Sequence, residues 1–218
     1  MTSRLFLFDL DGTLVDSAPD LAGAMNEMLV ARGRPELPLE VLRGPSGHGG
    51  PALLKAAFDM DRTHPDFEPM RLEFLERYAA RATKASFVFP GIFEMLDRLA
   101  AAGMRMGVVT NKPQHLAEIV CDHFKLTPYM SAVVGLGPEG TALKPKPDSL
   151  IYALKLAETP ASGALYAGDS TSDGIACKPI GVPTAWVSWG CQTAVPEPGL
   201  FAVHVHSPKA LADWALSI

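Results

Sequence analysis

The sequence predicts an α/β fold: a Rossmann-like parallel sheet with helices on both faces, plus a small all-helical cap domain. Two observations support this. Short apolar runs alternate with helical patterns from residue 85 onward, and one isolated apolar run lies near the start. Between them, residues 17–84 show helical spacing only. Alternating strands and helices build parallel sheets. We therefore expect a discontinuous core of residues 1–16 and 85–218, and a helical cap over 17–84.

The core elements follow from their apolar runs. Leu5–Phe8 is uninterrupted and ends in charge and glycine, which is typical of a buried strand feeding a loop. Further strands of the same sheet are expected at 105–109, 132–134, 164–167, 183–188 and 201–206. Helical spacing predicts helices over 92–102, 113–124 and 148–157.

The inserted segment has its own start and stop signals. Ser17, Pro19 and Asp20 resemble a helix start, and Arg32-Gly33 ends that helix. Helical patterns then continue at 39–42, from Pro51, and over 65–82.

The first candidate site is Asp9-Leu10-Asp11-Gly12-Thr13, directly after the first strand. In open α/β sheets, ligands bind at the carboxyl ends of the strands. Two aspartates separated by one residue project to the same side and repel each other unless a cation or a proton lies between them. A calcium loop also begins with this pattern, but its required glycine would be Leu14 and its closing glutamate Asp20. The stretch therefore indicates a different kind of metal site.

Two further strand ends carry groups suited to binding phosphate. Thr110-Asn111 ends a strand just before a helix expected at Pro113, where backbone amides can meet an anion. Lys144-Pro145-Lys146-Pro147 precedes another helix, and its prolines stiffen the chain around a lysine. Both lysines are candidates, and the spacing of the prolines favours Lys144.

A second pair of aspartates follows another apolar run, as in the first site: Gly168-Asp169-Ser170-Thr171-Ser172-Asp173 comes directly after the strand expected at 164–167. Two carboxylates four residues apart across a strand-to-helix turn can face one ion. Taken alone, each of these stretches has a structural explanation as a helix cap or an exposed turn. Together they supply acid, hydroxyl, lysine and acid at four strand ends.

The four motifs resemble, in order and spacing, those of the haloacid dehalogenase superfamily, whose phosphatase branch has two aspartates in its first motif. The helical insertion is similar to the cap of the branch that includes phosphoglycolate phosphatase. This resemblance implies that Asp9 is a nucleophile that forms an aspartyl-phosphate. It implies that Asp11 protonates the leaving group and then activates water. Thr110 and the amides of Asn111 and Gly12 would bind the phosphate oxygens.

The same resemblance implies Mg²⁺ as cofactor. The ion would be held by Asp9, the backbone carbonyl of Asp11 and Asp169, with Asp173 as a ligand or water anchor. Together with Lys144, it would offset the repulsion between an anionic nucleophile and an anionic phosphate.

Substrate choice is expected to lie in the cap. Residues 44–50 are its only glycine-rich segment, and Pro51 after them makes a helix start that could meet an anion. Arg43 and His48 are the candidate substrate-binding residues there. This stretch resembles the cap loop of phosphoglycolate phosphatases and equally that of N-acetylmuramic acid 6-phosphate phosphatases. Both substrates carry a carboxylate, so an arginine clamp does not separate them.

The expected partner is a small phosphorylated metabolite, with 2-phosphoglycolate placed first and N-acetylmuramic acid 6-phosphate or another sugar phosphate as the alternative. From a different class, a receiver-type signalling module also accepts phosphate on aspartate. Such a module needs neither Asp11 nor a helical insertion. A catalytically silent phosphate-binding protein would have to keep all these groups unused.

Charge, cysteine content and hydrophobicity exclude several other classes of protein. The net charge is −5, and the sequence has no cluster of basic residues of the kind that nucleic-acid binding needs. We therefore do not expect nucleic acid as a partner. Three widely spaced cysteines suit a reducing compartment rather than a disulfide framework. The start of the chain has no apolar leader, and no apolar run reaches membrane-spanning length. We expect a cytoplasmic protein without a membrane partner, as a monomer or a dimer.

Overall fold

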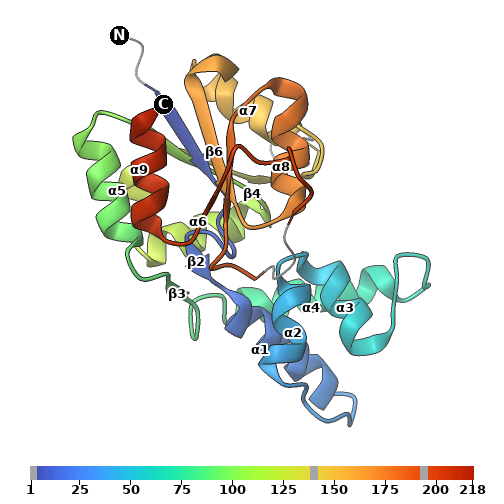
Figure 1. Cartoon of the computed structure of the whole chain (residues 1–218). Helices are drawn as coiled ribbons and strands as arrows, with labels where there is room; N and C mark the ends of the chain where they lie inside the picture. The colour runs from blue at the N-terminus through green and yellow to red at the C-terminus, as the bar shows by residue number, and fades with distance from the viewer. Residues whose placement is uncertain (1–3, 138–141, 192–195) are drawn as a thin grey trace.

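The chain is described here from a computed structural model, which covers residues 4–137, 142–191 and 196–218. Residues 1–3, 138–141 and 192–195 of the expected core lie outside this description. A six-stranded parallel sheet, in the order β5-β4-β1-β6-β7-β8, forms the centre of the core (Figure 1). Its strands are β1 (Leu5–Phe8), β4 (Arg105–Pro113), β5 (Met130–Leu136), β6 (Ala164–Gly168), β7 (Thr184–Val187) and β8 (Val203–Val205).

Two helical layers cover this sheet, as the alternation of side chains along β1 requires. Phe6 and Phe8 point into one apolar cluster, and Leu5 and Leu7 point into another on the opposite face. The first cluster is completed by α5 (Ile92–Ala101), α6 (Gln114–His123) and α9 (Pro208–Ser217). The second is completed by α7 (Asp148–Leu156) and α8 (Thr171–Cys177). The predicted fold class is therefore confirmed.

The register of the central strands brings their carboxyl ends to one level. Phe8 is paired with Val108 on one side and with Ala167 on the other. The next residues of β1, β4 and β6 therefore emerge together at one edge of the sheet, where parallel sheets bind ligands.

Four helices form a separate bundle below this edge (Figure 1). They are α1 (Ala18–Val30), α2 (Leu39–Ser46), α3 (Gly49–Phe58) and α4 (Phe67–Ala79). The chain enters and leaves the bundle through an antiparallel ribbon of β2 (Val15–Asp16) and β3 (Phe87–Val88). The insertion therefore begins and ends at one place on the core.

Three expected boundaries differ from the structure. The helix expected from Pro51 begins at Gly49, and α2 continues through Pro45 to Ser46, so most of the glycine-rich segment 44–50 is helical. Strand β4 runs to Pro113, where a helix start was expected, because Pro113 pairs with Leu136 across a register shift. Helix α9 was not anticipated, although Ser207 caps it and Pro208 opens it.

A buried carboxylate fastens the two ends of the insertion. Asp20, in the first turn of α1, accepts hydrogen bonds from the backbone N–H groups of Ala85 and Ser86 at 2.9 and 2.8 Å. It also accepts one from the Ser86 hydroxyl at 2.7 Å, and Arg81 lies 3.4 Å away. Burial raises the pKa of Asp20, but these hydrogen bonds outweigh it, so the pKa lies below its ordinary value. The start of α1 is thereby tied to the segment after α4.

We predict that Asp20→Asn lowers the free energy of unfolding at pH 7 by about 2 kcal/mol, because one neutral oxygen cannot replace a carboxylate with several donors. A group with a lowered pKa in the folded state stabilises above its unfolded pKa, near 3.8, and loses that effect as pH falls through its folded value. In urea titrations, the gap between wild type and variant should therefore close below about pH 4. A gap that stays constant down to pH 3 would contradict this role.

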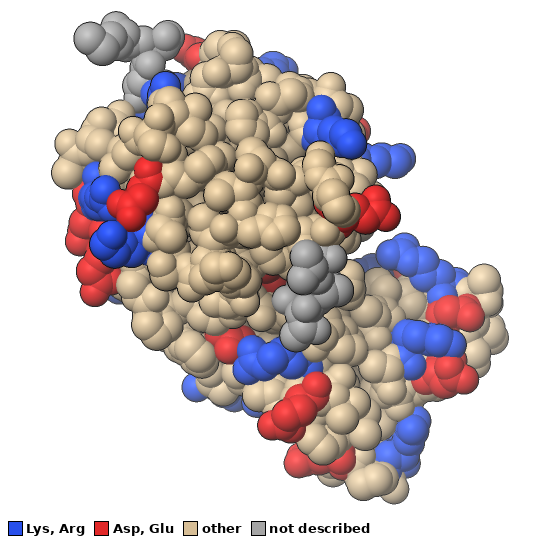
Figure 2. Space-filling model, viewed as in Figure 1, with Lys and Arg blue, Asp and Glu red and all other residues tan. Residues whose placement is uncertain are grey.

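Charge on the visible surface is mixed. Basic side chains over the helical bundle and beside α5 and α9 alternate with acidic ones (Figure 2), as in the pairs Arg32–Glu73 and Arg98–Asp213. In the part of the chain that the structure describes, no helix is long and apolar enough to cross a membrane. All three cysteines are buried and free of disulfides.

Candidate active site

Three carboxylates from two strand ends meet at the edge of the sheet. Asp9 follows β1, while Asp169 and Asp173 flank the turn from β6 into α8. One oxygen from each lies within 4.8 Å of the others. Asp169 and Asp173 are fully enclosed, and Asp9 is nearly so.

Among the described residues, one ammonium group faces this cluster. Lys144 Nζ lies 3.2 Å from Asp9 Oδ2 and 2.6 Å from Asp173 Oδ1. It also donates to the Val109 carbonyl at 3.0 Å and contacts the Tyr166 hydroxyl at 2.6 Å. The competing lysine, Lys146, is exposed. The sequence does not single out Tyr166 as a site residue, because it falls inside an apolar strand where an aromatic side chain is expected in the core.

The charges in this cluster do not balance without a further cation. Burial raises the pKa of Asp9 to about 6 even though Lys144 opposes the shift. Burial, together with Asp9 and Asp173, raises the pKa of Asp169 well above its ordinary range. Three carboxylates against one ammonium, with oxygen ligands in reach of one point, fit a hard divalent cation such as Mg²⁺.

The three acids are not equivalent as ligands. Asp173 Oδ1 is held by Lys144 and Tyr166, and its Oδ2 accepts from the Ser170 N–H at 3.0 Å in a capping box at the start of α8. Asp169 Oδ2 accepts from the Cys191 N–H at 2.7 Å, and Asp9 Oδ1 accepts from the Leu10 N–H at 2.7 Å. Within the described part of the chain, Asp173 therefore has the most hydrogen bonds of the three acids, and these contacts hold Lys144 in place.

Gly12 makes room for this arrangement. A Cβ atom there would lie 2.3 Å from Asp169 Oδ2, and its φ of +83° is one that side chains disfavour. Its N–H donates to the Val15 carbonyl at 2.8 Å in this structure. Gly12 allows close packing against Asp169, and the binding of phosphate by its amide stays a prediction.

Asn111 and Thr110 extend β4 beside the cluster. The Asn111 side chain donates to the Lys144 carbonyl at 2.9 Å and accepts from the Lys144 N–H at 2.8 Å. This two-way bond holds the lysine loop against β4. Thr110 is buried, and its hydroxyl accepts from the Lys112 N–H at 3.3 Å.

Asp11 has a partner that sequence analysis missed. Lys112 Nζ donates to both carboxylate oxygens of Asp11 at 2.8 Å. The same ammonium stands over the ring of Tyr78, 4.5 Å from its centroid. Lys112 lies two residues beyond Thr110 in the extended β4, so both side chains point the same way. That two-residue spacing was the available signal.

The two candidate cap residues belong to the helical bundle and not to the carboxylate cluster. Arg43, in α2, pairs with Asp16 of the ribbon, with Nη1 at 2.8 and 3.0 Å from its two oxygens. His48 is exposed at the N-cap of α3. Arg43 therefore joins the helical bundle to the ribbon in this structure.

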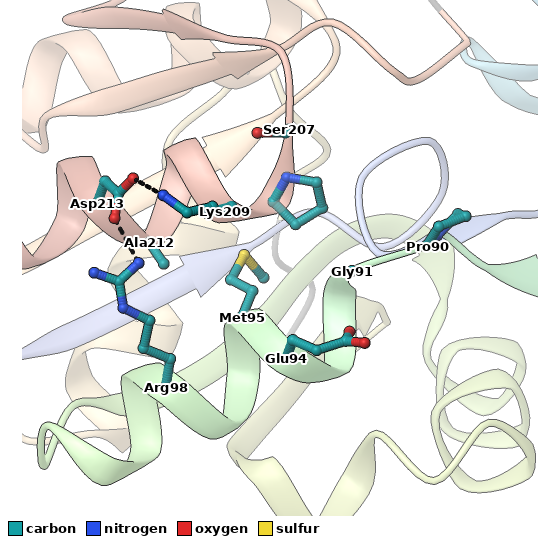
Figure 3. A pocket seen from close by; sticks show the side chains of 10 residues that line it. Pro90, Gly91, Glu94, Met95, Arg98, Ser207, Lys209, Ala212 and Asp213 are labelled. Atoms are coloured by element: carbon teal, nitrogen blue, oxygen red, sulfur yellow. Dashed lines mark hydrogen bonds and ion pairs between the residues drawn. The ribbon is translucent and has the colours of Figure 1, made fainter.

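A separate cavity of about 700 Å³ lies between α5 and α9 (Figure 3). Three of its four charged lining residues, Arg98, Asp213 and Lys209, are already joined by ion pairs of 2.5 and 3.0 Å. No described residue that lines it belongs to the carboxylate cluster. The cavity is therefore not the catalytic site.

Known proteins resemble this chain in both sequence and architecture. A family model for haloacid dehalogenase-like hydrolases matches residues 6–187. A phosphoglycolate phosphatase of Pseudomonas savastanoi pv. phaseolicola is 39% identical over 86% of this chain and 70% of its own length. Another from Xanthomonas campestris pv. campestris is 36% identical over 89% of this chain and 87% of its own. A crystal structure of a predicted phosphoglycolate phosphatase from Haemophilus somnus 129pt superposes with a TM-score of 0.82 at 25% identity, covering 98% of this chain and 99% of that one.

Proposed function

Because the chain belongs to the haloacid dehalogenase-like hydrolases and is a phosphatase, we propose that it hydrolyses 2-phosphoglycolate through an aspartyl-phosphate at Asp9, with Mg²⁺ as cofactor. The observation that carries the mechanism is the contact between Asp9 and Lys144 inside an acidic cluster, with a second aspartate, Asp11, two residues away. The substrate assignment is supported by the names of relatives at 36–39% identity.

In the first step, an Asp9 oxygen attacks phosphorus and the bond from phosphorus to the ester oxygen breaks. Asp11 gives its proton to the departing oxygen, which leaves as glycolate. In the second step, Asp11 takes a proton from water, the water oxygen attacks phosphorus, and the bond to Asp9 breaks. Inorganic phosphate leaves, and both carboxyl groups return to their starting states.

Lys144 lowers the repulsion between the Asp9 carboxylate and the incoming phosphate and keeps that carboxylate in place. Mg²⁺, held by Asp9, Asp169 and the Asp11 carbonyl, would supply further positive charge and a template for the phosphate oxygens. Thr110 and the Asn111 amide would bind two of those oxygens. Asn111 additionally keeps the Lys144 loop in position.

We assign residues 17–84 to a cap that covers this site, with the ribbon β2–β3 as its attachment. Arg43 and His48 are the cap residues proposed to meet the substrate carboxylate, and Arg43 would turn from Asp16 to do so. N-acetylmuramic acid 6-phosphate is the alternative substrate, because it offers the same two anionic groups. Membership of a hydrolase family argues against the receiver-type module. The three unpaired cysteines suit a cytoplasmic location.

The purified protein should release phosphate from 2-phosphoglycolate only with Mg²⁺ present. EDTA should reduce the rate to background, and excess Mg²⁺ should restore it, because the clustered carboxylates repel substrate without the ion. The measurement is kcat/KM across 2-phosphoglycolate, N-acetylmuramic acid 6-phosphate and alkyl phosphates that have no carboxylate. A tenfold preference for the muramic acid ester would overturn the substrate assignment. Turnover unaffected by EDTA would overturn the cofactor.

A further inference from the structure

Lys112 is a buried cation that the reaction steps above do not use. Its side chain is 3% exposed, and it comes from the end of β4, beside the catalytic edge of the sheet. Among the described residues, Asp11 is its only ion-pair partner, at 2.8 Å from each carboxylate oxygen. Lys144, by contrast, is fully engaged by Asp9 and Asp173. The two lysines therefore serve different aspartates.

The pair with Asp11 is maintained by its surroundings. Lys112 Nζ lies 2.8 Å from both Asp11 oxygens and 4.5 Å from the centroid of the Tyr78 ring. Two hydrogen bonds of equal length to one carboxylate restrict both of its side-chain torsions, so Asp11 is held in one orientation.

The helical bundle closes the other side of Lys112. Tyr78, near the end of α4, places its ring 4.5 Å from Lys112 Nζ and is itself 1% exposed. Its ring lies parallel to that of Phe74 one turn earlier, at 6.2 Å and an angle of 10°. A cation over an aromatic face is attracted by the ring electrons. The contact therefore links the bundle to the core at the acid–base residue.

We propose that Lys112 is a positioning residue that orients the Asp11 carboxyl group, which gives its proton to the leaving oxygen and later takes one from water, and that Tyr78 of the helical bundle fixes Lys112 in turn. This inference rests on the proposed role of Asp11. It makes the packing of α4 against the core a condition for efficient proton transfer to the leaving group. A misplaced proton donor costs most when the leaving oxygen is strongly basic.

The test compares leaving groups. An alkyl ester such as 2-phosphoglycolate needs a proton on its leaving oxygen, whereas p-nitrophenyl phosphate releases a stable phenolate. Lys112→Met keeps the length of the side chain and removes its charge. We expect it to lower kcat about 30-fold or more for the alkyl ester and less than about 3-fold for the aryl ester, with little change in KM.

Two Tyr78 variants probe the link to the bundle. Tyr78→Phe keeps the ring face and should retain the wild-type ratio of alkyl to aryl rates. Tyr78→Leu removes the face and should shift that ratio in the same direction as Lys112→Met, by a smaller factor. The double variant Lys112→Met/Tyr78→Leu should show the ratio of Lys112→Met alone, because Tyr78 acts through the lysine.

Several results would overturn the proposal. One is an equal loss for both esters in Lys112→Met, which indicates a general structural effect. Another is a KM that rises for 2-phosphoglycolate but not for ethyl phosphate, which makes Lys112 a binding group for the substrate carboxylate. Additive effects in the double variant would remove the role of Tyr78. If the wild type hydrolyses none of these esters, the proposed function itself fails, which is a separate outcome.

Discussion

Asp9→Asn should lower kcat by about 10⁴-fold or more, because the amide cannot attack phosphorus and Asp173, the other described carboxylate paired with Lys144, is fixed by hydrogen bonds from Lys144, Tyr166 and the Ser170 N–H. Acid-quenched wild-type enzyme incubated with ³²P-labelled substrate should carry label on Asp9, identified by peptide mapping. The variant should carry none. Turnover within tenfold of wild type would remove Asp9 as the nucleophile.

Stability provides the control for this variant. Burial raises the pKa of Asp9 to about 6, so the charged form of Asp9 lowers the folding stability of the metal-free protein. Removing that charge leaves fewer carboxylates around Lys144. The thermal midpoint of metal-free Asp9→Asn should therefore equal or exceed that of wild type. A large fall would mean that lost activity reflects misfolding.

Lys144→Met should damage both stability and activity. It leaves the buried carboxylates of Asp9 and Asp173 without their shared ammonium, which costs about 3–5 kcal/mol in comparable buried pairs. The rate should fall about 10²- to 10³-fold, because positive charge at the reacting phosphate is lost. Urea unfolding and steady-state kinetics measure the two effects.

Lys146 offers a matched control, because it is exposed and only two residues away. Lys146→Met should change the free energy of unfolding by less than about 0.5 kcal/mol and leave kcat unchanged. Added Mg²⁺ should raise the thermal midpoint of Lys144→Met more than that of wild type, since the ion relieves the same repulsion. Equal effects from both lysine substitutions would contradict the assignment of Lys144.

Local patterns predicted most of the fold. The run Leu5–Phe8 and the helix 92–102 are identified by apolar spacing alone, and each agrees with the structure to within about one residue. The motif carboxylates could be grouped because strand ends share one edge of a parallel sheet. The structure brings Asp9, Asp169 and Asp173 together there.

What could not be predicted depends on contacts between distant segments. Lys112 pairs with Asp11 across about a hundred positions of sequence, and its spacing from Thr110 does not identify Asp11 as its partner. From the sequence, Tyr78 is an ordinary core residue of a helix. Only the folded structure places its ring beside Lys112. The hydrogen bond from the Gly12 N–H to the Val15 carbonyl depends on how the loop closes on itself, which no local pattern predicts.

The ribbon of β2 and β3 also has a consequence for the order of folding. Phe8 pairs with Val108, roughly 100 residues away along the chain. Once Val15 has paired with Val88, the effective separation of Phe8 and Val108 falls to roughly 30 residues. The loop-closure cost of joining β1 to β4 then falls by about 1 kcal/mol. We expect the helical insertion to form early and to act as a local hairpin that brings β1 to the strands that follow the insertion.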